Sequence, residues 1–143
     1  MEVAIEEAKL AMLEDEVPVG AVVVYQDKII ARAHNRTISL NDPTAHAEIL
    51  AIRKAAKYFS NYRLIDCILI STLEPCIMCA GAMVNARIDG LVFGARDPKG
   101  GAIYSKMDFL SLNFLNHRFW IKEGVFQDIC GSLLKDFFKA KRM

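Results

Sequence analysis

Two short motifs constrain this chain more than any other feature, because the fold must bring them together for either to be useful. The first contains His46 and Glu48, and the second contains Cys76 and Cys79 directly after a proline. One His and two Cys are ligands that zinc prefers, and a catalytic zinc keeps its fourth position for water. The two motifs therefore predict a three-ligand zinc site with the carboxylate of Glu48 left over beside it.

Both motifs are predicted at the start of a helix. Residues 41–44 (Asn-Asp-Pro-Thr) are typical of a helix entry, and apolar residues then recur at helical spacing as far as Phe59. The apolar, β-branched run over 66–73 predicts a buried strand, and a helix is expected over 76–87. Partial positive charge at a helix N-terminus would stabilise the thiolates of the second motif.

The spacing inside each motif indicates which residues would bind the metal and which would carry a proton. Cys76 and Cys79 are three positions apart, so they share one helix face and can bind the same ion. His46 and Glu48 are two positions apart, so their side chains point in different directions. If His46 faces the metal, Glu48 is free to act on the open coordination position as a proton carrier.

The remaining elements predict an α/β fold. Helices are expected over 1–15 and 125–141, strands over 21–25, 29–31, 91–95 and 118–122, and a loop-rich segment over 96–116. Strands that alternate with helices favour a layered fold around a mostly parallel sheet, here with one antiparallel hairpin. With 143 residues and no repeat or linker, the chain is expected to form one domain over residues 1–143.

Composition excludes some classes of function. A net charge of +1 argues against a grossly basic nucleic-acid binder, although a local basic patch can hide in that sum. No apolar run is long enough to span a bilayer, and the acidic first residues do not read as a targeting peptide. The four cysteines lie among lysine-rich segments without disulfide-like density, which favours a reducing, cytoplasmic setting.

Other interpretations of the motifs remain open at this point. A Cys-x-x-Cys pair after a strand is also typical of a thioredoxin-like redox site, which predicts reversible oxidation and no zinc. His34 or His117 could close the metal site as a fourth ligand, in which case the chain would be a zinc-stabilised binding module. Cys67 and Cys130 lie among apolar residues and are expected to be packed in the core.

The motif pair matches the zinc deaminase signature, His-x-Glu followed by Pro-Cys-x-x-Cys. The similarity extends over nearly everything from Glu16 onward, and the chain resembles the bacterial tRNA-specific adenosine deaminases. The segments that carry this resemblance are 17–21, 35–36, 42–48, 61–64, 73–76, 78–83, 87–88, 93–97, 116–118 and 136–138.

The resemblance implies a cytidine-deaminase-like, three-layer α-β-α fold with a central mixed five-stranded sheet flanked by helices. It also implies a homodimer that converts the wobble adenosine of a tRNA anticodon stem-loop to inosine. One Zn²⁺ per subunit would be held by His46, Cys76 and Cys79, with Glu48 as the catalytic proton carrier.

Substrate-binding residues are also implied by the resemblance. Asn35 is expected to contact the target base, Asp97 and Phe138 to meet flanking nucleotides, and Lys99 and Arg142 to contact the RNA. The basic, aromatic tail over 135–142 suits phosphates and splayed bases, but it is equally a solvated helix end.

Two features bear on the substrate. Guanine deaminases also resemble the segment 42–48, so they remain the nearest alternative. The loop at 98–101 is unusually rich in Gly and Pro for the family, and the larger Ile103 and Tyr104 follow it.

Overall fold

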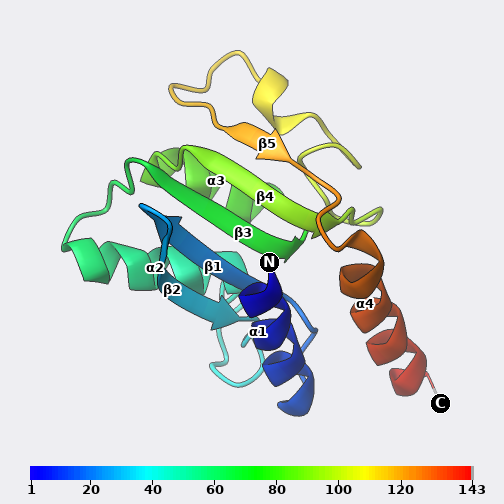
Figure 1. Cartoon of the computed structure of the whole chain (residues 1–143). Coiled ribbons are helices and arrows are strands. Elements are labelled where there is room, and N and C mark those ends of the chain that lie inside the picture. Colours follow the sequence, from blue (N-terminus) through cyan, green and yellow to red (C-terminus); the bar gives the residue numbers. More distant parts are fainter. Residues whose placement is uncertain (143) are drawn as a thin grey trace.

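A mixed five-stranded sheet forms the centre of the computed structural model, which describes residues 1–142 (Figure 1). The strands lie side by side in the order β2-β1-β3-β4-β5. In chain order the elements are α1 (Glu2–Leu13), β1 (Gly20–Tyr25), β2 (Lys28–His34), α2 (Ala47–Phe59), β3 (Cys67–Leu73), α3 (Ile77–Ala86), β4 (Gly90–Ala95), a 3-10 turn (Phe109–Ser111), β5 (Trp120–Lys122) and α4 (Gln127–Lys141).

Helices cover both faces of this sheet. Figure 1 shows α2 and α3 behind the strands and α1 and α4 in front of them. The main core lies between the sheet and the α2–α3 layer, where side chains such as Leu69, Met83 and Phe93 are fully buried. A smaller cluster under α1 and α4 contains Ile5 and Cys130. The predicted three-layer α-β-α fold with a mixed five-stranded sheet is therefore confirmed.

The sheet has the one antiparallel hairpin that the sequence predicts, and four of its five strands run in the same direction. β1 pairs antiparallel with β2, as expected, but it also pairs antiparallel with β3. β3 with β4 and β4 with β5 are parallel. The reason is the position of β1: the crossover through α2 makes β2 and β3 parallel to each other, and β1 lies between them.

Most element boundaries agree with the sequence to within a few residues. The second strand of the hairpin is the main exception, because it continues to His34 instead of ending at residue 31. Cys67 and Cys130 are both buried, as predicted. None of the helices in residues 1–142 has the length and apolar character needed to cross a membrane.

The topology brings three chain segments to one edge of the sheet. β3 and β4 are parallel neighbours, so the segments that follow Leu73 and Ala95 emerge side by side. The segment after β3 leads directly into α3, and the N-terminal end of α2 lies next to it. This edge, at the carboxyl ends of parallel strands, is where open α/β sheets commonly bind ligands.

Candidate active site

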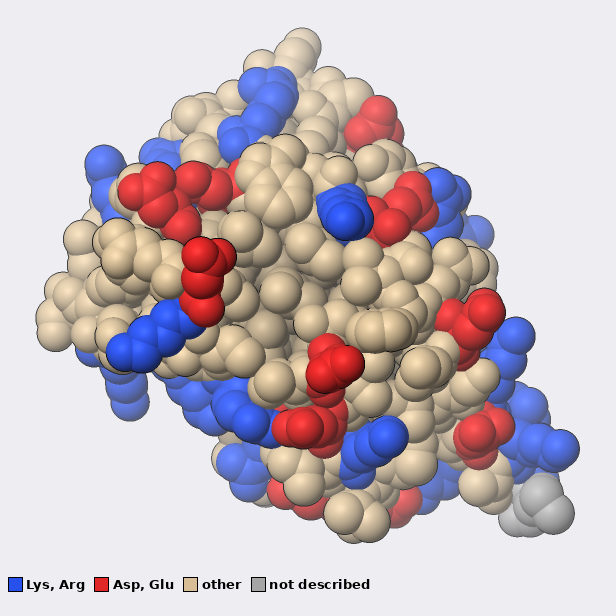
Figure 2. All heavy atoms as spheres, in the orientation of Figure 1, with Lys and Arg blue, Asp and Glu red and all other residues tan. Residues whose placement is uncertain are grey.

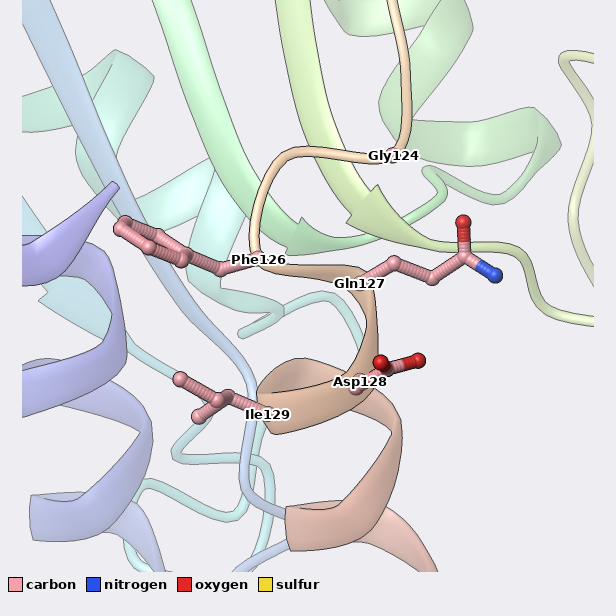
Figure 3. Close-up of a pocket in the computed structure, with 5 residues that line it drawn as sticks. All are labelled: Gly124, Phe126, Gln127, Asp128 and Ile129. Carbon is pink, nitrogen blue, oxygen red and sulfur yellow. The ribbon is translucent and has the colours of Figure 1, made fainter.

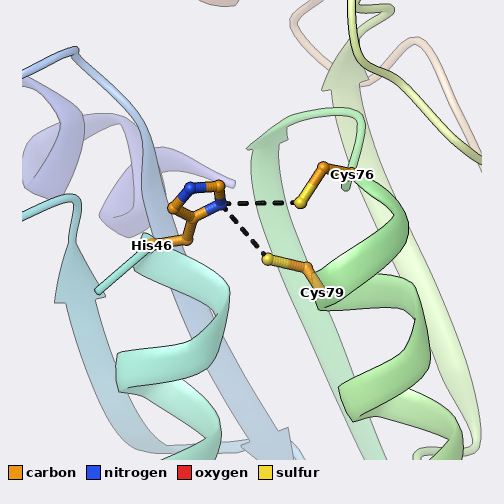
Figure 4. A group of neighbouring side chains, drawn as sticks. All are labelled: His46, Cys76 and Cys79. Carbon is orange, nitrogen blue, oxygen red and sulfur yellow. Dashed lines mark hydrogen bonds between the residues drawn. The ribbon is translucent and has the colours of Figure 1, made fainter. Parts of the chain in front are cut away.

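One histidine and two cysteines form a compact cluster at two adjacent helix starts (Figure 4). His46 is the residue before α2 and Cys76 the residue before α3, while Cys79 lies in the first turn of α3. The Nδ1 atom of His46 lies 3.6 Å from Sγ of Cys76 and 3.5 Å from Sγ of Cys79.

These separations fit a tetrahedral zinc ion. Zinc–nitrogen bonds of about 2.0–2.1 Å and zinc–sulfur bonds of about 2.3 Å place the N and S atoms at two corners of a tetrahedron about 3.6 Å apart. The observed distances match that edge, and all three ligand atoms lie within 4.8 Å of one another. The donor set is the one that the motif spacing predicted.

The cluster already favours a thiolate. A hydrogen bond from the Cys79 thiol, together with one from His46, lowers the pKa of Cys76 to about 4 despite its burial. The same hydrogen bond and burial raise the pKa of Cys79, while the bond to Cys76 raises the pKa of His46. One ligand is therefore ionised at neutral pH, as metal binding requires, and the second thiol proton would leave when the metal enters.

Glu48 lies beside this cluster in the first turn of α2 and is only 4 % exposed. Burial raises the pKa of its carboxyl to about 7, with nearby His46 acting in the opposite direction. A carboxyl group with such a pKa can both accept and donate a proton near neutral pH, which is what general acid–base catalysis needs.

The cluster opens into a pocket of about 230 Å³. This volume is below the range of about 300–1,000 Å³ typical of drug-sized ligands, so the pocket suits a small ring system. Its lining residues come from α2, β3 and the loops around them: Val17, Val19, Asn35, Thr37, His46, Ala47, Glu48, Leu73, Glu74, Cys76 and Asp97. Of the predicted substrate contacts, Asn35 and Asp97 lie here.

The other three predicted contacts lie outside this pocket. Lys99 is exposed in the loop after β4, and Phe138 and Arg142 are exposed at the C-terminal end of α4. Figure 2 shows Lys and Arg side chains gathered over that end of the helix. Lys141 pairs there with Asp15, close to the pocket residue Val17 along the chain.

A fourth protein ligand is not found among residues 1–142. His34 lies between two carboxylates, with Nδ1 2.9 Å from Glu7 and Nε2 2.8 Å from Glu14. His117 lies 2.7 Å from the carbonyl oxygen of Ile88. Both histidines thus have other partners, and within the described residues only His46, Cys76 and Cys79 form a group able to hold a metal ion.

A larger, shallower hollow of about 490 Å³ lies at the start of α4 (Figure 3). It is lined by Gly124, Phe126, Gln127, Asp128 and Ile129. Phe126 and Ile129 point toward α1, while Gln127 and Asp128 point the other way. A single carboxylate without His or Cys is a poor metal site, so the chemistry is placed in the smaller pocket.

Sequence reasoning missed one buried residue of the pocket, Glu74. It is 1 % exposed and accepts hydrogen bonds from the loop after β4. The available signal was a charged residue between the apolar strand β3 and Pro75, a place where a buried carboxylate needs several donors.

Comparison with known proteins adds family information. A model of MafB19-like deaminases matches residues 1–142. The chain is 46% identical to the tRNA-specific adenosine deaminase of Agrobacterium fabrum over 143 residues, which is 100% of this chain and 94% of the relative. The match to this relative therefore covers the whole of the present chain.

Two solved structures share the fold. One, from a study of A-to-I editing by tRNA:A34 deaminases at the wobble position, has a TM-score of 0.92 and 46% identity, covering 94% of this chain and 97% of its own. The guanine deaminase from Nitrosomonas europaea has a TM-score of 0.80 and 25% identity, covering 95% and 81%. Both sequence and structure are more similar to the first.

Proposed function

This chain belongs to the MafB19-like deaminases and to the family of tRNA-specific adenosine deaminases, and from that premise we propose that it hydrolyses the wobble adenosine of a tRNA anticodon to inosine and ammonia. The observation that carries the proposal is the position of Glu48, buried in a small pocket beside a three-ligand metal cluster. We propose that the whole chain acts as one deaminase domain.

His46, Cys76 and Cys79 would hold one Zn²⁺ per subunit, because their spacing fits a tetrahedral ion with one position left over. When bound, zinc supplies an activated water, since the metal lowers the pKa of water from ~15.7 to about 7.

Glu48 is the residue that moves protons. Its carboxylate would accept a proton from the attacking water and deliver it to N1 of the adenine ring, which makes C6 more electrophilic. It would then help to protonate the departing ammonia. A raised pKa and a buried position suit this sequence, because the group must take up and release a proton within one turnover.

The walls of the pocket would hold the base. We propose that Asn35 contacts the flipped adenine and that Asp97 meets a flanking nucleotide, since both line the pocket with Glu48. An anticodon loop already exposes its bases, so the enzyme needs only to capture one. Lys99, Phe138 and Arg142, exposed beyond the pocket, would contact the rest of the anticodon stem-loop.

The proposed setting is a homodimer in the cytoplasm. The family resemblance supports the dimer. The free state of all four cysteines is consistent with a reducing compartment.

The experiment that tests the function is ammonia release from three substrates in parallel: an anticodon stem-loop with a wobble adenosine, free guanine, and cytidine. We expect release from the stem-loop alone. Release from guanine alone would replace the proposal with the guanine deaminase alternative. Release from none of them by zinc-loaded protein would favour a zinc-stabilised binding module.

A further inference from the structure

The carboxylate of Glu74 connects the metal site to the loop that follows β4. Glu74 lies two residues before the metal-cluster residue Cys76. Its Oε1 accepts hydrogen bonds from the backbone N–H of Asp97 at 3.0 Å and from the hydroxyl of Ser105. Its Oε2 accepts from the backbone N–H groups of Ile103, Tyr104 and Ser105, at 3.0, 2.8 and 3.0 Å. Both ends of the 97–105 loop are therefore held by one side chain.

The same loop closes tightly around that carboxylate. A Cβ atom added to Gly101 would lie 2.3–2.6 Å from the carboxyl atoms of Glu74, far inside contact distance. Two further backbone hydrogen bonds hold the loop in place, from Gly101 to Asp97 at 2.9 Å and from Ala102 to Pro75 at 2.9 Å. This glycine of the unusually Gly-rich loop is thus required by the close approach to Glu74.

We propose that Glu74 is a positioning residue, which fixes the Asp97 side of the pocket relative to the metal cluster. The inference rests on the proposed function, because it assigns Asp97 to a nucleotide next to the target base. Asp97 and Glu74 both line the pocket, and the Asp97 side chain is itself directed into the loop by hydrogen bonds from Lys99 and Gly100. Glu74 acts on the substrate only through this loop.

A Glu74→Gln substitution tests the idea with little change of shape. Glutamine has one acceptor oxygen, which best replaces Oε2 because that atom accepts three N–H groups. The NH₂ group then replaces Oε1 and faces the N–H of Asp97, so two donors oppose each other. The substitution should therefore release the Asp97 end of the loop while the other end stays bound.

The measurements are steady-state kinetics on the anticodon stem-loop, zinc content, and amide hydrogen exchange. For Glu74→Gln we expect KM to rise about tenfold, the size expected from losing a hydrogen bond to a charged group, with a smaller change in kcat. Zinc content should stay at the wild-type level, and exchange should increase at the Asp97 amide. A fall in kcat with loss of zinc and unchanged KM would overturn the proposal.

Repeating the Glu74→Gln substitution in an Asp97→Ala variant shows whether Glu74 acts through Asp97 or weakens substrate binding in another way. If Glu74 acts through Asp97, Glu74→Gln should add little to the effect of Asp97→Ala, whereas independent effects would add. Additive effects would overturn the proposal. The matched control is Glu123→Gln, which removes the same charge from an exposed ion pair with Arg96 beside the loop and should change KM by less than about twofold.

Gly101→Ala provides a second route if Glu74→Gln does not fold. The added methyl group would push the loop away from an intact Glu74, and the same rise in KM is expected. A wild-type protein that is inactive on the stem-loop would refute the proposed function. In that case amide hydrogen exchange still tests the role of Glu74. Unchanged exchange at residues 97 and 103–105 in Glu74→Gln would overturn that role.

Discussion

Glu48 and Glu74 are two buried carboxyl groups of the same pocket, and their pKa values are shifted in opposite directions. Burial raises the pKa of Glu48 to about 7. Burial acts in the same direction on Glu74, but hydrogen bonds from Ser105, Tyr104 and Asp97 outweigh it and lower the pKa. Burial dominates at Glu48 and raises its pKa toward neutral pH, whereas the donors around Glu74 favour the anion of that carboxyl group.

The difference explains why one site can use both residues. A proton carrier must change its charge during turnover, so it cannot be surrounded by donors that favour one form. A loop anchor must keep its charge, because protonation places a hydrogen on one oxygen and weakens the hydrogen bonds that the carboxyl group accepts. We infer that the number of N–H donors around each carboxylate separates the two roles.

The largest effect should come from removing a proposed metal ligand. This change removes the metal beside Glu48 but leaves the hydrogen bonds of Glu74 in place. Cys76→Ala should lose zinc and all measurable deamination, because two ligands do not retain the ion. Metal analysis and ammonia release check this. The matched control is Cys67→Ala, which removes a buried cysteine of β3 and should keep both zinc and activity. A zinc-free wild type with a reversible Cys76–Cys79 disulfide would instead support the redox interpretation.

Next in size is the loss of Glu48, the proposed proton carrier. Glu48→Ala should slow deamination by about 10²–10⁴-fold, the usual contribution of general acid–base catalysis, and should keep its zinc because Glu48 is not a ligand. Single-turnover rates on the stem-loop and metal content measure the two properties separately. Near-normal turnover in this variant would remove Glu48 from the role assigned to it.

Glu16 is a second buried carboxylate that holds a loop by accepting hydrogen bonds, as Glu74 does. It is 1 % exposed and accepts hydrogen bonds from the N–H of Ile38 at 3.2 Å, and from the N–H and hydroxyl of Ser39 at 2.7 and 2.6 Å. Burial alone would raise the pKa of Glu16, but these bonds lower it. It holds the segment before α2 as Glu74 holds the loop after β4.

Glu16→Gln should therefore lower stability in a pH-dependent way. The folded pKa lies below the unfolded value of about 4.3, so the ionised group stabilises the fold above that pH and the benefit is lost as pH falls through the folded pKa. We expect a loss of about 1–3 kcal/mol at pH 7, shrinking toward pH 3. Urea unfolding at several pH values measures it, and a pH-independent difference would contradict this account. Glu6→Gln, an exposed partner of Arg32, is the control.

The sequence predicted which residues gather around the His-Cys cluster better than it predicted their surroundings, for a physical reason. His46, Glu48, Cys76 and Cys79 belong to local patterns, two helix starts whose spacing limits which side chains can share an ion. The antiparallel pairing of β1 with β3 and the donors of Glu74 depend on contacts between residues 23 to 52 positions apart, which leave no local pattern. Glu74 and Gly101 form such a pair: the sequence shows a charged residue before Pro75 and a Gly-rich loop, but not that the two meet.

The smallest effect should come from the basic tail, outside the pocket where both carboxylates lie. Lys139 and Arg142 are exposed at the end of α4, whereas Lys141 already pairs with Asp15. Replacing Lys139 and Arg142 together with Gln should weaken stem-loop binding by about fivefold at low salt, because each phosphate contact releases counterions. kcat at saturating substrate should stay unchanged.

Salt dependence distinguishes phosphate contacts from an indirect effect. For each phosphate that the variant no longer neutralises, the slope of log affinity against log salt should flatten by about 0.7, the value for single strands. Lys28→Gln is the control, because it removes one exposed cation at the turn between β1 and β2. This turn lies at the end of the two strands opposite to the pocket residue Val19. If the tail variant binds like wild type at low salt, the tail is a solvated helix end, and RNA affinity must come from the pocket walls and the loop that Glu74 holds.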